Sequence, residues 1–516
     1  MKLINDIVIW FMKKRFERIE HFKKYPVETQ QIVLEELLQT ARYTEWGQRY
    51  NYGQIKNAKE FAEQVPVSSY EDLFPFIERV LKGEPNVLWP TISDWFSKSS
   101  GTTNARSKFI PVSAESLEEC HYKGGKDMMT LLVQNRPDTS VFDGKGLSIG
   151  GTLHANPYNP DTKAGDISAI IVNNLPAWAQ YLRTPTLEIA LLDEWETKIA
   201  RMVETCSEEN VTNMLGVPTW AIVLLDRIME KKGASNMMEI WPDFQVFVHG
   251  AVAFTPYRDL FKTKYFPSSS VDYLEVYNAS EGYIAVQDDL SKVGEMLLML
   301  DYGIYYEFVP MSELHKKHPR TLTLDEVELN TNYALVMSTN AGLWRYLIGD
   351  TIKFTSKYPF RIKVSGRTKH FINAFGEEVI VENADISVTE ACSRTGAKIK
   401  EFTAAPIFMD ESGKGGHEWI FEFETQPADA ELFNKVLDEK LREVNSDYDA
   451  KRYKDMALLP PVVHHVPAGT FYRWMSGRGQ LGGQHKVPRL SNDRKYVDGL
   501  LELMETSKIP RKNDKP

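Results

Sequence analysis

The amino-acid sequence predicts an α/β protein with a large N-terminal domain of layered α/β sheets plus a small β-barrel, and a smaller α+β C-terminal domain. Three observations predict this class. Strand-like and helical segments alternate from Trp95 onward, the stretch 272–355 is rich in strands separated by turns, and a βαβ-like alternation begins near Gly366. The predicted domains are therefore residues 1–364 and 365–516.

The composition is that of a soluble globular protein, with 42% hydrophobic and 26% charged residues among 516. Acidic side chains outnumber basic ones, 71 to 61, which argues against a sequence-independent nucleic-acid binder because such a protein needs a basic face. The three cysteines, Cys120, Cys206 and Cys392, are far apart and form no C-x-x-C pair. This pattern argues against a disulfide framework and a cysteine-rich zinc site, and it predicts a cytoplasmic location.

The first ninety residues are predicted to form helices with prolines at their boundaries. Residues 3–12 contain a short apolar cluster, and Phe16, Ile19 and Phe22 continue its helical spacing. The cluster is too short to span a bilayer and lacks a signal-peptide cleavage site, so no membrane span is predicted. We expect an amphipathic helix that packs on the domain; a helix lying on a membrane surface is the alternative.

A short stretch that follows the first predicted strand combines small hydroxyl residues, a glycine and a lysine. Its residues are Ser99, Ser100, Gly101, Thr102, Thr103 and Lys108. Glycine lets backbone N–H groups approach phosphate oxygens, the hydroxyls donate further hydrogen bonds, and the lysine supplies positive charge. A strand over 108–112 follows, where a Walker-type loop would open a helix. The stretch is therefore predicted to be a mobile phosphate-binding flap between two strands, with an ordinary polar turn as the alternative.

Two further segments place candidate nucleotide ligands at strand ends. The strand-like run over 244–248 leads into Gly250 and Ala251, where the backbone could approach a planar ligand closely. Tyr277, Ser280 and Glu281 follow another strand-like run. Ligands of open α/β sheets collect at the carboxyl ends of strands. We expect Tyr277 to lie against a base, Ser280 to donate to an oxygen and Glu281 to hold Mg²⁺; an exposed turn is the alternative.

Three charged residues in the second half of the chain are further candidates. Asp350 follows a glycine between two strand-like runs, where its carboxylate suits two ribose hydroxyls, although a simple bulge is the alternative. Arg367 lies at the predicted domain boundary, as a hinge-site ligand or a solvated surface charge. Lys486 follows the glycine-rich stretch 469–483, which is predicted to be a flexible surface loop that could carry a cation to a distant site.

In their order along the chain, these pieces resemble the luciferase-type adenylate-forming superfamily. The spellings Ser-Ser-Gly-Thr-Thr, Tyr-Asn-Ala-Ser-Glu, Trp-Arg-Tyr-Leu-Ile-Gly-Asp and Gln-His-Lys-Val-Pro-Arg resemble one branch most closely, the auxin-responsive-promoter family of acyl acid amido synthetases. The resemblance spans nearly the whole chain. It implies that ATP with Mg²⁺ converts a carboxylic acid to acyl-AMP, and that an amine, such as an amino acid, then receives the acyl group as an amide.

The resemblance also implies roles for individual residues. It assigns catalysis to Lys108, Glu281 and Lys486, and it makes Glu281 the ligand of Mg²⁺ as well. A mobile C-terminal domain would cover the site for the second step. Asn373 stands where many superfamily members carry a lysine, which disfavours coenzyme A as the acceptor. An acyl-CoA ligase with the same adenylation step, and a nucleotide-binding protein that has lost catalysis, are the alternative functions.

The candidate lining of an acyl pocket lies within residues 214–220, which are apolar with one hydroxyl group. Its residues are Leu215, Val217, Pro218 and Trp220. This lining suits an aromatic or small aliphatic acid. The start of a core helix is the alternative interpretation of the same segment.

Overall fold

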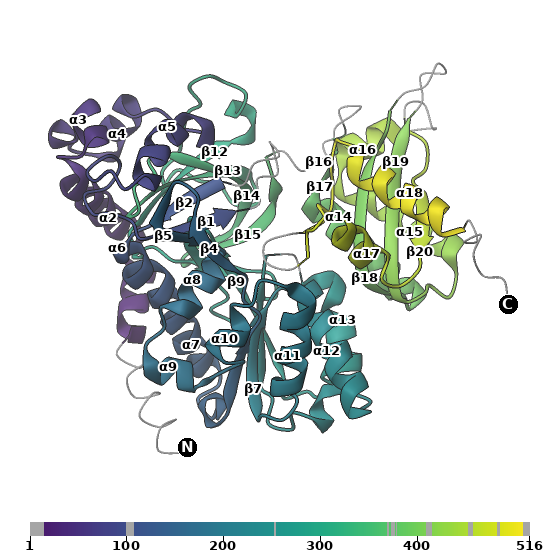
Figure 1. The fold of residues 1–516 in the computed structure, drawn as a ribbon. Coiled ribbons are helices and arrows are strands. Elements are labelled where there is room, and N and C mark those ends of the chain that lie inside the picture. Colours follow the sequence, from purple (N-terminus) through teal and green to yellow (C-terminus); the bar gives the residue numbers. More distant parts are fainter. Residues whose placement is uncertain are drawn as a thin grey trace. The chain divides into compact units, whose positions relative to one another are not determined.

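The computed structural model describes residues 15–99, 108–251, 254–368, 371–372, 377, 379–408, 415–452, 458–481 and 486–508. The chain divides into two compact units. The large unit comprises Met1–Val252 and Phe266–Val364, and the small unit comprises Ala253–Tyr265 and Ser365–Pro516. Figure 1 shows the elements of each unit along the chain.

The N-terminal part of the large unit is helical, as the sequence predicts, although one of its prolines, Pro75, lies inside the helix Tyr70–Leu81 and not at a helix boundary. Its helices are α2 (Pro26–Ala41), α3 (Glu45–Arg49), α4 (Ala58–Gln64) and α5 (Tyr70–Leu81), with the short turn η1 (Tyr52–Gln54). Pro26 opens α2, where its missing N–H costs nothing, and α5 begins with a capping box between Ser69 and Asp72. Residues 15–24 are also helical, and Ile19 and Phe22 on this segment are buried. Residues 1–14 lie outside the described part of the chain.

Eleven strands of the large unit form one sheet with the order β12-β13-β14-β15-β11-β10-β9-β8-β7-β3-β6. The five strands at one end of this order, from β9 to β6, are parallel to one another. They are β3 (Lys145–Ser148), β6 (Arg183–Thr184), β7 (Val211–Gly216), β8 (Val246–Gly250) and β9 (Asp272–Ala279). Because these strands are parallel, their carboxyl ends meet at one edge of the sheet.

The remaining strands of the sheet form antiparallel pairs. They are β10 (Gly282–Val286), β11 (Met296–Leu298), β12 (Ile304–Pro310), β13 (Asn332–Thr339), β14 (Tyr346–Lys357) and β15 (Phe360–Arg367). The sequence predicts a small antiparallel sheet or barrel in this region. The strands are antiparallel as expected, but they continue the parallel strands, because β9 pairs with β10.

A second sheet of the large unit contains four strands in the order β2-β1-β5-β4. They are β1 (Trp95–Ser99), β2 (Lys108–Val112), β4 (Leu153–Asn156) and β5 (Asn159–Gly165). β1 and β2 are antiparallel, and Ser99 pairs with Lys108. The two ends of the predicted phosphate loop are thus held together by strand pairing.

Helical segments connect the strands of the large unit. They are α6 (Ala114–Ser116), the π-helix η2 (Leu117–Tyr122), α7 (Lys123–Asn135), α8 (Ile167–Asn173), α9 (Ala177–Tyr181), α10 (Leu187–Ala190), α11 (Trp195–Cys206) and α12 (Pro218–Lys232). Short turns are η3 (Val141–Asp143), η4 (Met237–Glu239) and η7 (Met311–Glu313). α11 and α12 lie side by side (Figure 1), and Trp195 packs edge-on against Trp220 between them.

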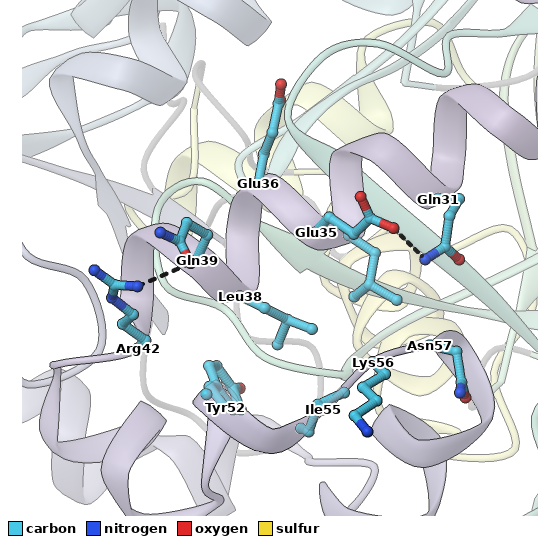
Figure 2. Close-up of a pocket in the computed structure, with 12 residues that line it drawn as sticks. Gln31, Glu35, Glu36, Leu38, Gln39, Arg42, Tyr52, Ile55, Lys56 and Asn57 are labelled. Carbon is cyan, nitrogen blue, oxygen red and sulfur yellow. Dashed lines mark hydrogen bonds between the residues drawn. The ribbon is translucent and has the colours of Figure 1, made fainter.

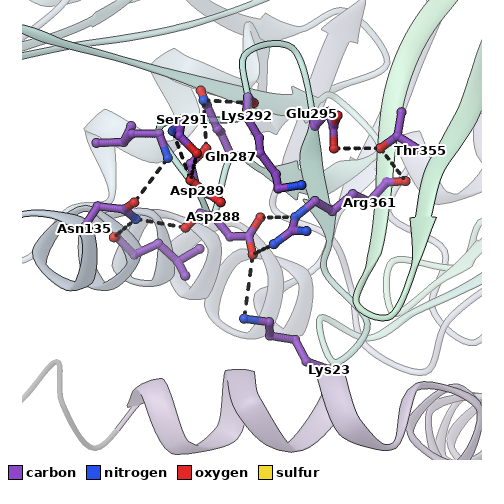
Figure 3. Close-up of polar contacts among 12 residues, drawn as sticks. Lys23, Asn135, Gln287, Asp288, Asp289, Ser291, Lys292, Glu295, Thr355 and Arg361 are labelled. Atoms are coloured by element: carbon purple, nitrogen blue, oxygen red, sulfur yellow. Dashed lines mark hydrogen bonds and ion pairs between the residues drawn. The ribbon is translucent and has the colours of Figure 1, made fainter.

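A polar network ties the first described helical residues to the antiparallel strands (Figure 3). Arg361 on β15 donates two hydrogen bonds to Asp288, at 2.7 and 2.9 Å, and Lys23 lies 3.7 Å from the same carboxylate. Asp288 is 3% exposed, and both cations balance its charge. The network is a structural anchor of the large unit, since a buried carboxylate is stable only when it is paired.

The small unit has a three-stranded sheet with the order β18-β19-β20. Its elements are β16 (Phe371–Ile372), β17 (Val379–Ile380), α14 (Val381–Thr395), β18 (Lys398–Ile407), β19 (Gly416–Thr425), α15 (Ala430–Val444), α16 (Ser446–Arg452), β20 (Val462–Val466), α17 (Thr470–Gly477) and α18 (Lys495–Lys508). Apolar side chains of α14 and α15 share one core cluster with Phe402, Trp419 and Phe421 of the sheet. The small unit therefore has its own hydrophobic core.

A segment from the middle of the large unit's sequence belongs to the small unit. It contains η5 (Thr255–Tyr257), α13 (Arg258–Leu260) and η6 (Phe261–Tyr265), and it lies between β8 and β9 in the chain. Tyr257 is fully buried, and its hydroxyl accepts a hydrogen bond from Arg489. The chain consequently passes between the two units three times, where the sequence alone suggests a single boundary.

The glycine-rich stretch before Lys486 is not a loop throughout, and the prediction of a loop over 469–483 is wrong for residues 470–477. They form helix α17, which buries Phe471, Trp474 and Met475 at helical spacing. The carboxylate of Glu422 accepts hydrogen bonds from the N–H groups of residues 469 and 471 at the start of this helix. No helix among the described residues is long and apolar enough to cross a membrane.

Candidate functional site

The sheet brings two of the predicted nucleotide segments to neighbouring positions. Gly250 ends β8 and pairs with Val276 on β9, and the Tyr277–Glu281 segment continues from there. A Cβ atom at Gly250 would lie 2.4 Å from the carbonyl oxygen of Val276, so only glycine fits this position. The next residue, Ala251, has a φ of +71°, a conformation that is costly for a non-glycine residue. The backbone at the end of β8 therefore adopts an unusual conformation beside Tyr277.

Tyr277 and Asp350 meet directly. The Tyr277 hydroxyl donates a hydrogen bond to Asp350 Oδ2 at 2.5 Å, and the Asp350 side chain is buried. In the sheet order, β9 and β14 are separated by three other strands. The antiparallel strands must therefore curl over β9 for the two side chains to touch. This curvature brings the predicted base and ribose ligands together.

Lys108 lies between two tyrosine side chains. Its Nζ donates a hydrogen bond to the hydroxyl of Tyr346 at 3.2 Å. The same atom lies 5.4 Å from the ring centre of Tyr70 and 5.7 Å from that of Tyr346, within the range of a cation–π interaction. Tyr70 is fixed in turn, because its hydroxyl accepts a hydrogen bond from the N–H of Phe109 at 2.8 Å. The ammonium group is thus oriented before any phosphate binds.

Two buried acidic residues, Glu281 and Asp350, lie near Tyr346. Glu281 and Asp350 are 9% and 7% exposed. Burial raises the pKa of Tyr346 well above its usual value, and the nearby charges of Glu281 and Asp350 raise it further. Burial also raises the pKa of Tyr70 to about 12, with a smaller contribution from Glu281. Both tyrosines therefore stay neutral, and the site holds a cation and two acidic residues in a poorly solvated place.

A histidine on the π-helix η2 supports the Tyr277–Glu281 segment from behind. His121 Nδ1 and Asn278 Oδ1 are 3.2 Å apart, and His121 is 3% exposed. Burial lowers the pKa of His121 to about 4, so the imidazole is neutral near pH 7 and its Nδ1–H is the donor to the amide oxygen. The adjacent Cys120 Sγ accepts a hydrogen bond from the N–H of Tyr283. Single-turn π-helices occur frequently at functional sites.

The other predicted site residues lie elsewhere or outside the described residues. Arg367 ends β15 and is exposed, and Lys486 is half-buried; both belong to the small unit. Ser99 ends β1, whereas residues 100–103 of the phosphate loop lie outside the described part of the chain, as does Asn373. Ser280 is buried next to Glu281.

The four predicted acyl-pocket residues have different surroundings. Leu215 on β7 is 43% exposed, although β7 has a neighbouring strand on each side, and Val217 is half-buried. Pro218 and Trp220 are buried at the start of α12. The exposure of Leu215 fits the lining of an acyl pocket, whereas the burial of Pro218 and Trp220 fits the start of a core helix.

A separate pocket of about 420 Å³ lies between α2 and the segment around η1 (Figure 2). Its polar residues include Glu35, Gln39 and Lys56, and none of the predicted site residues lines it. Within the described residues, no group of three or more histidine, cysteine, aspartate or glutamate side chains is arranged to hold a metal ion.

Three family models match the chain: the GH3 family N-terminal domain at residues 15–271, the central domain at 297–367 and the C-terminal domain at 382–495. The chain belongs to the GH3 family. This is the acyl acid amido synthetase family that the motifs resemble, and that recognition is confirmed.

Curated GH3 relatives match over almost their whole length. The chain is 24% identical to indole-3-acetic acid-amido synthetase GH3.3 of Arabidopsis thaliana, over 92% of this chain and 91% of the relative. It is 22% identical to 4-substituted benzoates-glutamate ligase GH3.12 of the same organism, over 99% of both chains.

Solved structures have the same fold. AtGH3.15 acyl acid amido synthetase in complex with 2,4-DB superimposes with a TM-score of 0.78 at 18% identity, covering 95% of this chain and 96% of the other. A 2-hydroxyisobutyryl-CoA ligase has a TM-score of 0.60 at 14% identity, covering 92% and 91%. The predicted fold class is confirmed.

Three side chains of this GH3 site were not selected from the sequence. Tyr346 belongs to the Trp-Arg-Tyr-Leu-Ile-Gly-Asp motif and lies four residues before Asp350 on β14, but the irregular strand pairing between the two residues hides their relation from the alternating pattern. Tyr70 and His121 belong to no motif of this kind. They lie on α5 and η2, and only the tertiary fold brings them to Lys108 and Asn278.

Proposed function

We propose that the protein adenylates a carboxylic acid with ATP and transfers the acyl group to an amino acid, giving an amide. The observation that carries this proposal is the meeting of Lys108, Glu281 and Asp350, with Tyr277 and Tyr346, in one buried polar site of a GH3-family fold. These groups fit the two anionic substrates and the ribose of the nucleotide.

The adenylation step needs charge neutralisation and alignment. A carboxylate oxygen of the acid attacks the α-phosphorus of ATP, the bond from that phosphorus to the oxygen of the β-phosphate breaks, and pyrophosphate leaves. Lys108, already oriented by Tyr346 and Tyr70, offsets negative charge on the phosphates. Asp350 accepts the ribose hydroxyls, and its bond from Tyr277 sets the orientation of its carboxylate.

Glu281 supplies the carboxylate for Mg²⁺. One buried carboxylate beside a phosphate site is a donor set that fits this ion, which usually takes one or two carboxylates and completes its coordination with phosphates and water. When bound, Mg²⁺ neutralises charge on the phosphates during transfer.

In the second step, the amine nitrogen attacks the acyl carbon, the bond to the AMP oxygen breaks, and the amine loses a proton. The small unit, with Arg367 and Lys486, is proposed to move between the two steps, together with residues 253–265.

Cys120, Cys206 and Cys392 are free thiols, which supports a reducing compartment such as the cytoplasm.

Pyrophosphate exchange into ATP tests the first step with a panel of carboxylic acids. Lys486→Ala should lower acid-dependent exchange about a hundredfold, the effect of losing one contact to the developing charge. Lys495→Ala, which removes an exposed lysine of the same unit, is the matched control and should exchange at the wild-type rate. If Lys486→Ala exchanged pyrophosphate at the wild-type rate with saturating substrates, Lys486 would have no role in the adenylation step.

A further inference from the structure

Arg489 lies three residues after Lys486, in the same Gln-His-Lys-Val-Pro-Arg motif. Lys486 is half-buried, whereas every residue from 487 to 491 is buried in the small unit. The side chain of Arg489 is only 8% exposed. Lys486 is therefore attached directly to a segment that is enclosed by the small unit.

The main chain of this buried segment lies along the edge of strand β18. The N–H of Ala404 donates to the carbonyl oxygen of Arg489 at 2.9 Å, and the N–H of Ser491 donates to the carbonyl oxygen of Ala404 at 3.0 Å. Thr403 Oγ1 donates a further hydrogen bond to the carbonyl oxygen of Pro488 at 2.6 Å. These bonds attach the segment to β18.

The guanidinium of Arg489 joins this segment to two other parts of the small unit. It forms an ion pair with Glu401 of β18 and donates a hydrogen bond to the hydroxyl of Tyr257 on η5. It also donates to the carbonyl oxygen of Phe402 at 3.1 Å, and its centre lies 4.5 Å from the centre of the Phe402 ring. A planar group with five N–H donors can make these contacts together, and a lysine ammonium cannot.

A second acidic residue, Asp385 of α14, also lies near Arg489. Burial raises the pKa of Asp385 to about 7, and the positive charge of Arg489 opposes this rise. The turn η5, which carries Tyr257, contacts both α14 and β18. Arg489 therefore lies where three elements of the small unit meet, and it connects all of them to the segment that follows Lys486.

Arg452 is a second buried arginine of the small unit, with similar contacts in a different place. Its guanidinium forms an ion pair with Asp438 at 2.6 Å and donates to the carbonyl oxygen of Leu458 at 3.0 Å. It is 5% exposed, so it matches Arg489 in burial and in chemistry. It joins α15 and α16, and neither helix carries a predicted site residue. A comparison of the two arginines therefore separates a weaker small unit from a displaced Lys486.

We infer that Arg489 is a positioning residue for adenylation, because its contacts with Glu401 and Tyr257 hold the main chain from which Lys486 extends. The inference rests on the proposed function, in which Lys486 acts in the adenylation step. A displacement of about 1 Å in a group that binds the reacting atoms can cost about a hundredfold in rate, so the anchor of such a group matters. In this role Arg489 touches no substrate. It acts on adenylation and not on the later transfer of the acyl group.

The two half-reactions are measured separately in Arg489→Lys, with the acid that best supports pyrophosphate exchange. The variant keeps the charge and loses the planar fork that holds Glu401 and Tyr257 together. We expect exchange at saturating substrates to be about tenfold slower, with the KM for ATP unchanged. Single-turnover transfer from synthetic acyl-AMP to an amino acid should keep its wild-type rate. Arg452→Lys is the matched control and should keep both rates.

A double variant tests whether Arg489 acts through Lys486. If it does, Arg489→Lys combined with Lys486→Ala should exchange pyrophosphate no more slowly than Lys486→Ala alone, because the group to be positioned is already absent. Two independent contributions would instead multiply, and the double variant would be about tenfold slower than Lys486→Ala.

Hydrogen exchange provides a second measurement that does not depend on turnover. The amides of Ala404 and Ser491, which pair the segment with β18, should exchange faster in Arg489→Lys and at the wild-type rate in Arg452→Lys. If Arg489→Lys does not fold, Glu401→Gln takes its place in every comparison, because it removes the charge of the ion pair and keeps the side-chain shape.

Equal losses of adenylation and acyl transfer in Arg489→Lys would overturn the inference and make Arg489 a structural residue. Wild-type adenylation in this variant, multiplied losses in the double variant, or unchanged exchange of the Ala404 and Ser491 amides would overturn it as well. If Lys486→Ala adenylates at the wild-type rate, the inference fails and the proposed function stands. If no acid supports pyrophosphate exchange in the wild type, the proposed function itself fails, and the inference fails with it.

Discussion

Lys108 Nζ donates a hydrogen bond to the hydroxyl of Tyr346 at 3.2 Å, although the two residues are 238 positions apart in the chain. The contact links the end of the predicted phosphate loop to the strand that carries Asp350. A flexible lysine side chain loses entropy when it is held, so a lysine that is already oriented binds phosphate at a lower cost.

Tyr346→Phe should therefore slow adenylation without unfolding the protein. The variant keeps the ring that faces the ammonium group and loses only the hydrogen bond, and we expect about a tenfold lower rate of pyrophosphate exchange. Tyr358→Phe is the matched control, because it removes the same hydroxyl group from a residue that is 77% exposed. Equal rates in the two variants would show that Tyr346 plays no part in orienting Lys108.

The second prediction concerns Mg²⁺. Glu281→Gln should raise the Mg²⁺ concentration needed for half-maximal exchange, because an amide oxygen is a poorer ligand for a hard cation than a carboxylate. The dependence of the initial rate on Mg²⁺ at saturating ATP measures this shift, with the exposed Glu118→Gln as control. An unchanged dependence in Glu281→Gln would contradict the assignment of Glu281 as the metal ligand.

The third prediction concerns pH. The pKa of His121 is lowered from 6.5 to about 4 in the folded protein, chiefly by burial, so the unfolded chain binds the proton more tightly. Folding stability should then fall as pH drops from about 6.5 to about 4. His121 accounts for a loss of about 2 kcal/mol between pH 7 and pH 5. Urea unfolding of the wild type and His121→Gln at both pH values measures it, and an identical loss in both proteins would refute the neutral buried histidine.

The fourth prediction concerns the segment that joins the small unit. Tyr257→Phe removes a buried hydroxyl that accepts from Arg489, and we expect faster hydrogen exchange in residues 258–265 together with strand β18. Strand β9, which follows the segment in the chain but belongs to the large unit, should be unaffected. Faster exchange in β9 with none in β18 would place the segment with the large unit.

Much of the fold could be predicted because its signals are local. The change of pattern near Gly366, the alternation after Trp95 and the strand-rich stretch 272–355 are visible in sequence windows. The joining of the antiparallel strands to the parallel ones is not visible in this way, because it depends on pairing between β9 and β10 and on curvature. The sequence does not predict helix α17, because the glycines that flank it suggest a loop. In the structure, Phe471, Trp474 and Met475 are buried at helical spacing, and Glu422 caps the start of the helix.

The candidate site, like the fold, is only partly predictable from the sequence. Lys108, Glu281 and Asp350 can be predicted because their side chains suit phosphate, Mg²⁺ and ribose hydroxyls, and because their motifs occur in the order typical of the adenylate-forming superfamily. Tyr70 and His121 are a tyrosine and a histidine on helical segments, types that usually fill a core, and nothing local separates them from such residues.

The central claim is that the acyl group passes from AMP to an amino acid. The most direct measurement mixes the protein with ATP, Mg²⁺ and an acid that supports pyrophosphate exchange, adds either a panel of amino acids or coenzyme A, and follows AMP release and product mass together. We expect AMP release that depends on an amino acid, with an amide whose mass is that of acid plus amino acid less one water. AMP release with coenzyme A and a thioester product, with no amide for any amino acid, would contradict it.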